Sequence, residues 1–363
     1  MDEIKLLEQA PLFCADKHVS YIVRLTQQLS SPDSFEGALT EHLKMSGVYW
    51  ALTALSLLTA KKTVDELMNT AEIVDWVITC WDETSGGFAG NTGQDGHILY
   101  TLSALQILAL TDNLNDPRIQ FDRVVRFIAS LQQTDGSFVG DAFGEIDTRF
   151  TYCAFQSLAL LQALHEIDIH AAVNYLKRTL NFDGGCGANI GGESHAGQVF
   201  CGVAALSIAC RLDVIDGDQL GWWLSERQVD SGGLNGRPEK QADVCYSWWI
   251  LSALSIIGRV SWISGDRLAG YILKCQDGDD GGIADRPDDM PDVFHTFFGV
   301  AGLSLLGTLH RGENINRFSR TIDPVYALPS DIVRNLKLPG QVMIHDELDS
   351  RLAIYCTLEE KTR

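Results

Sequence analysis

The chain of 363 residues is long enough for two or three ordinary domains, or for one large domain built from repeats. Its 28 Lys and Arg against 48 Asp and Glu give a formal net charge of −20, which excludes a general affinity for nucleic acid or anionic lipid. Any anion must therefore bind at a local cluster of basic residues. With 45% hydrophobic and 21% charged residues and no low-complexity segment, the composition predicts a chain that is folded throughout.

The nine cysteines are odd in number and show neither the spacing of a disulfide module nor paired C-x-x-C motifs. The acidic N-terminus, MDEIKLLEQA, has no hydrophobic leader. Uncharged runs reach only 15 residues, whereas a helix that spans a bilayer needs about 20. These features predict a reduced, cytoplasmic protein without a transmembrane segment.

A glycine turn recurs six times along the chain and divides it into repeats of close to 49 residues. The apolar residue at the centre of each turn is, in chain order, Phe35, Phe88, Phe138, Cys186, Leu234 and Ile283. An amphipathic segment precedes each turn, as in residues 121–131, where apolar side chains share one helical face. An uncharged run follows each turn, and these runs align on Leu55, Leu105, Leu158, Leu206, Leu254 and Leu303.

A helix that is apolar on every side has to be enclosed by other elements. Each repeat therefore predicts an outer amphipathic helix and an inner apolar helix, joined by a turn in which glycine supplies a positive φ. Six such hairpins predict an all-α fold, an α/α toroid with inner and outer rings of helices. An open solenoid is the alternative, although neither end carries a strongly polar capping repeat.

The whole chain, residues 1–363, is expected to form a single toroid domain. Its repeats cover about residues 15–310. The C-terminal extension, residues 311–363, contains three prolines and leaves the repeat pattern. We expect this extension to wrap the outside of the toroid.

Polar residues recur where the inner helices are expected to begin. Counted back from the aligned leucines, four share one position and two lie one turn deeper: Asp147, His195, Asp243 and Asp292, then His97 and His295. A ring of helix N-termini offers unpaired N–H groups and positive dipole ends, which suits an anionic ligand at that rim. For any one of these residues a helix cap is the simpler interpretation, and Asp147 and Asp292 are assigned to caps.

Asp243, Cys245 and His295 form a sharper pattern. Cys245 and His295 are 50 residues apart, one repeat, so they are expected at matching height on neighbouring inner helices, with Asp243 in the turn beside them. Carboxylate, thiolate and imidazole are ligands that zinc takes, and three protein ligands leave the open position of a catalytic site. Such a site can hold an incoming thiol as thiolate. The alternative is a helix cap beside a buried cysteine.

A cluster of basic residues stands next to these ligands. Arg237 and Lys240 lie in the glycine turn before them, and His195 and Tyr246 are expected at the same rim. Two cations, an imidazole and a phenol form a plausible clamp for a diphosphate. The alternative is a solvated loop in which Glu239 neutralises one charge.

Several aromatic residues fall on the expected inner helices: Trp50, Tyr152, Trp248, Trp249, Phe294 and Phe297. They form either plain core or the lining of an apolar pocket, for which a bore between six helices leaves room. Residues 277–280, Asp-Gly-Asp-Asp, match the D-x-D-D motif of class II terpene cyclases. This match lies in the sixth glycine turn, where the repeat marks the residues as structural.

Over roughly residues 15–310 the sequence resembles the β subunits of protein prenyltransferases, most closely those of the Rab (type II) geranylgeranyltransferase. The segments that carry the resemblance are residues 45–50, 144–150, 193–198, 221–249 and 294–296. The run around Glu239 and the Trp at position 248 favour the Rab type over the farnesyl and type I enzymes.

The resemblance implies a catalytic β subunit that transfers a geranylgeranyl group from geranylgeranyl diphosphate to C-terminal cysteine thiols of Rab proteins, as a thioether. It implies one catalytic Zn²⁺ on Asp243, Cys245 and His295. It assigns the diphosphate to His195, Arg237, Lys240 and Tyr246, of which Lys240 and Tyr246 are also assigned catalytic roles. It assigns the isoprenoid pocket to Ser46, Trp50, Leu99, Arg149, Tyr152, Trp249 and Phe294.

The resemblance further implies an obligate heterodimer with a prenyltransferase α subunit and an escort protein that presents the Rab substrate. Asp285 matches a position that contacts magnesium in farnesyl members, so Mg²⁺ is a second expected cofactor. Two positions depart from the family: Tyr152 replaces an expected Phe, and the fourth turn carries Cys186 instead of an aromatic residue.

Four alternatives stay open at this point. A farnesyl or type I β subunit differs only in lipid and substrate. A terpene cyclase needs its catalytic acid in the bore. A complement-like thioester toroid needs a Cys followed by Glu-Gln, whereas Cys186 is followed by Gly187 and Ala188. A toroid scaffold without zinc has no use for the three predicted ligands.

Overall fold

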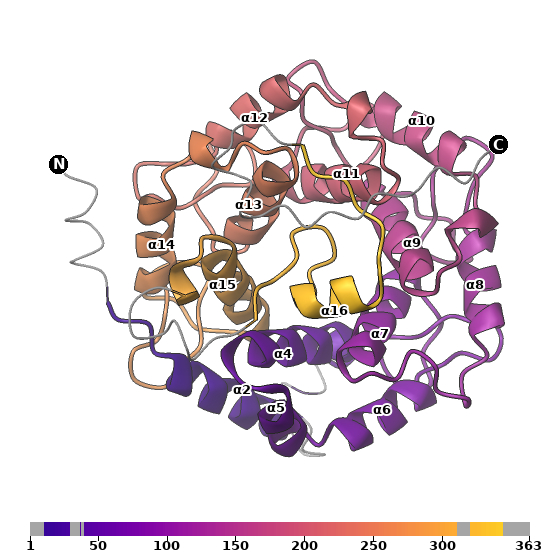
Figure 1. Cartoon of the computed structure of the whole chain (residues 1–363), viewed down its shortest axis with the longest axis horizontal. Coiled ribbons are helices and arrows are strands. Elements are labelled where there is room, and N and C mark those ends of the chain that lie inside the picture. The colour runs from indigo at the N-terminus through magenta and orange to yellow at the C-terminus, as the bar shows by residue number, and fades with distance from the viewer. Residues whose placement is uncertain (1–10, 30–36, 38–39, 311–319, 344–363) are drawn as a thin grey trace.

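The computed structural model describes residues 11–29, 37, 40–310 and 320–343. Six helices form an inner ring, which Figure 1 shows in cross-section. They are α4 (Lys44–Leu58), α7 (Ile98–Leu110), α9 (Thr148–Leu160), α11 (Ala196–Ile208), α13 (Tyr246–Ile256) and α15 (Val293–Leu305). Each packs against the next, and α15 packs against α4. The ring is therefore closed, which confirms the α/α toroid and excludes the open solenoid.

A second set of helices surrounds this ring (Figure 1). They are α2 (Ala15–Leu29), α5 (Lys61–Met68), α6 (Thr70–Thr79), α8 (Phe121–Ser130), α10 (Ile169–Thr179), α12 (Gly217–Ser225) and α14 (Gly265–Lys274). Short 3-10 helices follow or precede the inner helices at Glu41–Leu43, Leu164–Glu166, Leu212–Val214, Val260–Trp262 and Thr308–His310. A last short helix, α16 (Ser330–Asn335), belongs to the C-terminal segment.

The sequence of each helix explains its ring. On α8, Val124 and Ile128 are buried while Asp122 and Arg126 on the other face are exposed. The inner helix α7 has no charged residue, and its side chains from Thr101 to Leu110 are all buried. At about 25 cal/mol per Å² of apolar surface, burial on both faces of six inner helices is the main stabilising contribution to the fold.

The glycine turns have the predicted backbone. The leading glycine has a positive φ, between 80° and 91°, in five turns, at Gly86, Gly136, Gly184, Gly232 and Gly281. At Gly136 a Cβ would lie 2.1 Å from the carbonyl oxygen of Ala171, so close approach to the outer helix also requires glycine. Residues 34–36 of the first turn lie outside the described residues.

Backbone hydrogen bonds join each repeat to the next at one rim. Backbone N–H groups at or within two residues of the start of five inner helices donate to carbonyls of the following turn, at 2.8–3.0 Å. The pairs are Met45 to Gly90, Ile98 to Gly140, Thr148 to Ala188, Ala196 to Gly236, and Val244 to Asp285. Because successive repeats are tied in this way, the inner-helix N-termini gather at the same rim of the toroid.

Side chains cap four of these N-termini. The side chains of His97, Asp147, His195 and Asp292 each accept a backbone N–H from two or three residues ahead. The cap assignments of Asp147 and Asp292 are confirmed. His97 shares this position and does not lie one turn deeper, because α7 begins three residues later relative to its aligned leucine than α9, α11 and α15 do: seven residues before Leu105 instead of ten. His295 lies one turn in, as predicted.

The described part of the C-terminal extension does not wrap the outside. Residues 320–343 enter the ring, where Figure 1 shows them in yellow at its centre. Tyr326 and Leu328 are at most 1% exposed there. The expectation of an outer wrap is wrong for this part, because the segment is apolar and its backbone finds hydrogen-bond partners on the inner helices. Residues 311–319 and 344–363 lie outside the described residues.

No helix among the described residues is both long and apolar enough to cross a membrane. Seven cysteines of this part of the chain are free thiols, Cys14, Cys80, Cys153, Cys186, Cys201, Cys245 and Cys275, and Cys356 lies outside the described residues.

Asp323 generates a prediction about pH. Its side chain is buried, and Oδ1 accepts the N–H groups of Val325 and Tyr326, both at 2.9 Å. Burial outweighs these two bonds and raises the pKa of Asp323 to about 6. A carboxyl whose folded pKa exceeds its unfolded value of about 3.9 holds its proton longer when folded, so the stability it contributes falls as pH rises from about 4 to 6.

We therefore expect Asp323→Asn to raise the free energy of unfolding at pH 7 by about 1–3 kcal/mol and to remove this decline between pH 4 and 6. The amide oxygen can still accept both N–H groups. Urea unfolding at several pH values measures both effects, and an unchanged pH dependence in the variant would show that another group titrates.

Candidate functional site

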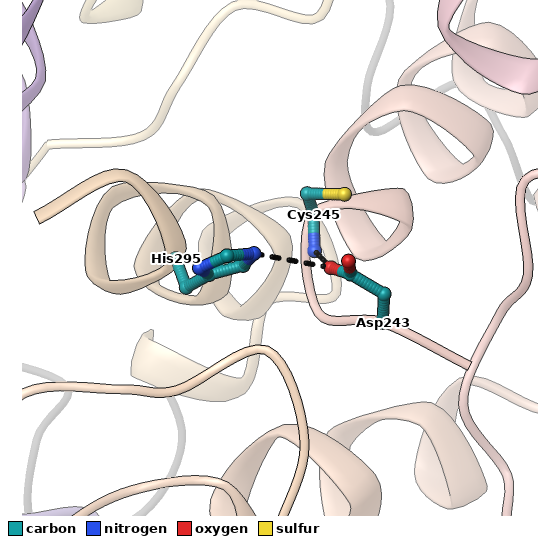
Figure 2. Close-up of side chains that lie close together, drawn as sticks. All are labelled: Asp243, Cys245 and His295. Atoms are coloured by element: carbon teal, nitrogen blue, oxygen red, sulfur yellow. Dashed lines mark hydrogen bonds and ion pairs between the residues drawn. The ribbon is translucent and has the colours of Figure 1, made fainter. Parts of the chain in front are cut away.

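Three potential metal ligands converge at the rim where the inner helices begin (Figure 2). Asp243 and Cys245 stand at the turn into α13, and His295 is the third residue of α15. Their ligand atoms all lie within 4.8 Å of one another, and His295 Nε2 is 3.3 Å from Asp243 Oδ1. The structure therefore brings together the three residues that the repeat spacing predicted.

The local backbone explains why this turn can present two ligands. Asp243 Oδ1 accepts the N–H of Cys245 at 2.7 Å, and the N–H of Val244 donates to the carbonyl of Asp285 in the next repeat. Asp243 thus closes the helix start as a cap would, while its carboxylate also faces His295 (Figure 2). The two interpretations from the sequence, cap and ligand, are compatible.

Each ligand has a displaced pKa. Burial opposes a charge on His295, but hydrogen bonds to Asp243 and Asp292 outweigh it and raise its pKa to about 9. For Asp243, burial is likewise outweighed, and bonds from His295 and Cys245 lower the pKa. Burial and the charge of Asp243 raise the pKa of Cys245. A cation at this point replaces the proton on His295 and favours the thiolate of Cys245.

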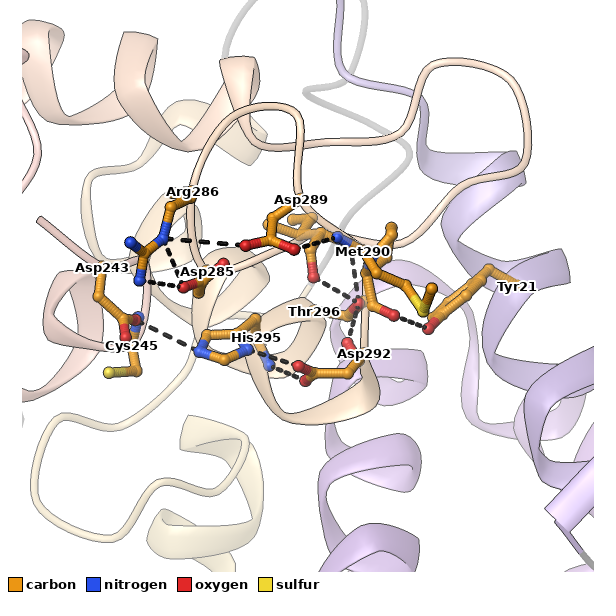
Figure 3. Close-up of polar contacts among 12 residues, drawn as sticks. Tyr21, Asp243, Cys245, Asp285, Arg286, Asp289, Met290, Asp292, His295 and Thr296 are labelled. Atoms are coloured by element: carbon orange, nitrogen blue, oxygen red, sulfur yellow. Dashed lines mark hydrogen bonds and ion pairs between the residues drawn. The ribbon is translucent and has the colours of Figure 1, made fainter. Parts of the chain in front are cut away.

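Asp292 contacts His295, one of the three predicted metal ligands, and the sequence analysis does not anticipate this contact. Its Oδ2 lies 2.7 Å from His295 Nδ1, and its Oδ1 accepts the backbone N–H of His295 at 2.8 Å (Figure 3). A carboxylate on the far nitrogen of a metal-binding histidine fixes its tautomer and ring orientation. The spacing Asp292 to His295, three residues at a helix start, was the available signal, but it was assigned to capping alone.

Asp285 is already engaged in an ion pair. Its Oδ2 lies 2.6 Å from Arg286, whose side chain also reaches toward Asp289 (Figure 3). This pair lies beside Asp243, because the carbonyl of Asp285 accepts the N–H of Val244. The Mg²⁺ expected at Asp285 stays a prediction.

The basic cluster forms beside the metal ligands. His195 Nε2 is 3.2 Å from the hydroxyl of Tyr246, and Arg237 forms an ion pair with Glu193. Lys240 is exposed and forms no ion pair with any described residue. The sequence named Glu239 as a neutralising partner, but that role falls to Glu193. Gly236 allows this packing, since a Cβ there would lie 2.2 Å from the Tyr246 ring.

Two members of this cluster are neutral hydrogen-bonding groups. Burial, and then the nearby Arg237, lower the pKa of His195, so its imidazole is uncharged at pH 7. Burial raises the pKa of Tyr246 to about 12. Because His195 Nδ1 accepts the N–H of Gly197 at 3.1 Å, its proton is assigned to Nε2. The positive charge of the cluster therefore resides on Arg237 and Lys240.

The rim offers fewer free N–H groups than the sequence suggested. Backbone N–H groups at or within two residues of the start of five inner helices donate to the next turn, and caps take others. The helix dipoles still favour negative charge at this rim. Hydrogen bonds to an anion must come mainly from side chains.

An aromatic wall adjoins the metal ligands. The ring of Phe294 lies 4.9 Å from those of Trp50 and His295 and 6.1 Å from that of Trp249. Trp249 also contacts Tyr246, at 5.5 Å, which joins the wall to the basic cluster. Trp50, Trp249 and Phe294 are each only partly buried. Inner-helix aromatics that keep accessible surface favour a lined pocket over plain core.

The other predicted lipid residues occupy different places. Ser46 on α4 bonds Ser103 on α7 at 3.1 Å between hydroxyls, and Leu99 on α7 is partly buried. Arg149 is exposed at the rim and bonds Asp147 at 2.9 Å, a position that suits a charged group better than a lipid. Tyr152 is buried, and its hydroxyl donates to the carbonyl of Val325 at 2.8 Å.

Comparison with known proteins places the chain. The model of the prenyltransferase alpha-alpha toroid domain matches residues 13–328. The chain belongs to this prenyltransferase family. It is 47% identical over 269 residues to the geranylgeranyl transferase type-2 subunit beta of Saccharomyces cerevisiae, a match that covers 72% of this chain and 80% of that protein. It is 53% identical over 263 residues to the type-2 subunit beta 1 of Arabidopsis thaliana, covering 72% and 79%. The family resemblance is confirmed.

Solved structures support the fold of this prenyltransferase. Candida albicans protein geranylgeranyltransferase-I complexed with GGPP superposes with a TM-score of 0.75 at 21% identity, covering 90% of this chain and 99% of that one. The type II terpene cyclase MstE from Scytonema gives a TM-score of 0.57 at 14% identity, covering 84% and 99%. At such identities both likenesses show the toroid alone.

The Asp292–His295 pair generates a second prediction. We expect Asp292→Asn to lower the affinity for added Zn²⁺ by about 10- to 100-fold, because His295 loses the carboxylate that orients it. Titration against a chelating indicator measures the affinity. Asp147→Asn is the matched control, since Asp147 caps α9 in the same way without contacting a predicted ligand. If the two variants bind Zn²⁺ with equal affinity, Asp292 serves only as a helix cap.

Proposed function

We propose that this chain is the catalytic β subunit of a Rab geranylgeranyltransferase. It transfers a geranylgeranyl group from geranylgeranyl diphosphate to C-terminal cysteine thiols of Rab proteins and forms a thioether. The observation that carries the proposal is the Asp243, Cys245 and His295 group between an aromatic wall and a basic cluster. The type-2 relatives at 46–53% identity support the type of lipid and substrate.

The three ligands fit one Zn²⁺. Carboxylate, thiolate and imidazole are the donors that zinc takes, and three of them leave a fourth position for substrate. His295 presents Nε2 toward Asp243 while Asp292 holds Nδ1, which is the arrangement of a ligand with its supporting carboxylate. Zinc bound here supplies a Lewis acid that keeps a substrate thiol deprotonated at neutral pH.

The basic cluster takes the diphosphate in this proposal. Arg237 and Lys240 supply charge, and His195 and Tyr246 supply neutral donors, so that negative charge which develops on the leaving oxygen meets donors already in place. Lys240 is not paired within the described residues, and it can turn toward the ligand without breaking an ion pair. Arg237 must share its guanidinium with Glu193.

The aromatic wall orients the isoprenoid. Trp50, Trp249 and Phe294 present apolar surface beside His295, so the first carbon of a lipid held there lies near the thiol position. The thiolate forms a bond to that carbon as the bond to the diphosphate oxygen breaks, and the diphosphate departs with the electron pair. Ser46 on α4 and Leu99 on α7 carry no ring, which leaves room at these two positions for a longer lipid.

The proposal includes partners. The type-2 relatives are named beta subunits, which supports an α subunit in an obligate heterodimer. An escort protein that presents the Rab substrate, and Mg²⁺ as a second cofactor, remain part of the proposal on family resemblance alone. The free cysteines agree with a cytoplasmic location.

The alternative enzymes have less support. A farnesyl or type I β subunit shares this site, but the type I structure is only 21% identical to the chain. The terpene cyclase motif at residues 277–280 is used by the fold, since Asp277 Oδ1 accepts the N–H groups of Asp279 and Asp280 at 2.8 and 2.9 Å. A scaffold protein without a metal ion would not explain why the ligand atoms of Asp243, Cys245 and His295 lie within 4.8 Å of one another.

The decisive experiment measures the zinc content and the geranylgeranyl-transfer activity of the same preparation. We expect the chain, co-expressed with an α subunit, to hold one zinc and to transfer labelled geranylgeranyl to an escorted Rab protein. Asp243→Ala, Cys245→Ala and His295→Ala should each lose most of the zinc and the activity, because two ligands hold the metal poorly. Cys201→Ala, a buried cysteine on α11, is the control that should keep both. Full transfer by a wild-type complex without zinc would falsify the metal assignment.

A further prediction concerns the diphosphate. Arg237→Ala and Lys240→Ala should each lower kcat by about ten- to a thousandfold while zinc stays bound, since both act on charge that develops in the transition state. Lys274→Ala, an exposed lysine at the end of α14, controls for the loss of one positive charge elsewhere. If kcat is unaltered in both Arg237→Ala and Lys240→Ala, the basic cluster does not bind the diphosphate. Single-turnover kinetics with metal analysis provide the comparison.

A further inference from the structure

The C-terminal segment is held inside the ring by its main-chain carbonyls. We call residues 322–328 the floor segment. Four consecutive carbonyls in it each accept a hydrogen bond from an inner-helix side chain. The pairs are Pro324 with Ser252 Oγ at 2.9 Å, Val325 with Tyr152 Oη at 2.8 Å, Tyr326 with Gln156 Nε2 at 2.6 Å, and Ala327 with Tyr49 Oη at 2.6 Å.

Other inner helices bind the same segment or its continuation. Gln106 on α7 also reaches the Tyr326 carbonyl, at 3.4 Å, and Ser304 on α15 accepts the N–H of Ile322 at 3.2 Å. Ser207 on α11 donates to the carbonyl of Gln341 at 2.7 Å. All six inner helices therefore contribute a polar side chain either to the floor segment or, from α11, to Gln341 in its continuation. Such placement indicates a built seat for the segment.

The seat lies below the metal ligands. On α15, Ser304 follows His295 by nine residues, which corresponds to about 14 Å along the helix at 1.5 Å per residue. Between these levels, buried rings from five inner helices form a chain of contacts. In order around the bore these are Tyr152, Phe200, Trp248, Phe297 and Tyr49, with centroids 5.1 to 6.4 Å apart. The floor segment supports this aromatic layer from beneath, through the hydroxyls of Tyr49 and Tyr152.

Tyr152 and Gln156 bear most directly on this arrangement. They stand one turn apart on α9 and bind the successive carbonyls of Val325 and Tyr326, both side chains being buried. The bond to Val325 depends on the Tyr152 hydroxyl, which a phenylalanine at this position would lack.

We propose that Tyr152 and Gln156 are positioning residues that hold the floor segment in place and so limit the length of isoprenoid that the bore accepts. This inference rests on the proposed function. Removing both donors takes the side-chain bond from the buried Val325 carbonyl and leaves the Tyr326 carbonyl with the longer bond from Gln106, at 3.4 Å, and weakening the hydrogen bonds of buried carbonyls in this way is costly. The segment then moves toward other partners, the aromatic layer loses its support, and the bore deepens.

The test compares wild type with Tyr152→Phe combined with Gln156→Met, which removes two donors at nearly constant volume. Each complex, loaded with zinc and its α subunit, receives farnesyl, geranylgeranyl and the 25-carbon geranylfarnesyl diphosphate. We expect kcat/KM for the 25-carbon lipid, relative to the 20-carbon one, to rise at least tenfold, while the 15- to 20-carbon ratio stays within twofold. Ser157→Ala is the matched control. It removes a neighbouring buried hydroxyl on α9 that has no hydrogen-bond partner among the described residues, and its ratios should equal those of wild type.

A second measurement does not depend on transfer. Hydrogen exchange at the amides of Val325 and Tyr326, which donate to Asp323, should be at least tenfold faster in the double variant than in wild type without lipid. If amide exchange is faster but the kcat/KM ratios for lipid length are unchanged, the proposed role in lipid length is wrong. If amide exchange is unchanged, Tyr152 and Gln156 do not hold the floor segment in place. Should the double variant not fold, Tyr152→Phe alone tests the same outcomes with a smaller expected effect. If the wild-type complex transfers none of the lipids, the proposed function is wrong. The hydrogen-exchange comparison would still test whether Tyr152 and Gln156 hold the floor segment in place.

Discussion

Six apolar helices that cannot face water impose the constraint on which the rest of the structure depends. Because every side of these helices has to be covered, the amphipathic helices form a complete outer ring, and α15 meets α4 to leave no exposed edge. Closure gives the inner helices a common direction, and among the described residues five of their six starts are tied to the next turn by a backbone hydrogen bond. One rim thereby collects the inner-helix N-termini, and the candidate metal ligands and the basic cluster lie there.

That constraint explains why much of the site was predictable. A repeat of near-constant length converts sequence separation into position, so Cys245 and His295, 50 residues apart, had to lie side by side. The same reasoning failed where the repeat is irregular: α7 is offset against its neighbours, which misplaced His97 by a turn. Asp292 was found as a cap but not as the partner of His295 Nδ1, because one carboxylate performs both functions and spacing reveals only the first.

The C-terminal segment could not be predicted because nothing in it repeats. Its signal lay in the inner helices, where Tyr152, Gln156 and Ser252 interrupt apolar sequence at buried positions away from the candidate metal ligands. A buried polar side chain needs a partner, so these residues required a backbone to enter the ring. The sequence analysis treats the inner helices as apolar on every side and assigns Tyr152 to the lipid pocket, and it therefore places the segment outside.

The two ends of the bore follow opposite electrostatic rules. At the rim the side chains are charged. The carboxylates of Asp243 and Asp292 raise the pKa of His295 to about 9. Arg237 and Lys240 bring local positive charge to a chain of net charge −20. At the floor, neutral hydroxyls and amides bind main-chain carbonyls, and the one carboxyl, Asp323, has its pKa raised by burial. A ligand with a charged head and an apolar tail therefore has one favourable orientation, head at the rim and tail toward the floor. Because the floor segment closes the other end of the bore, it also limits the length of the tail. A tail that is too long forces the head away from the metal ligands.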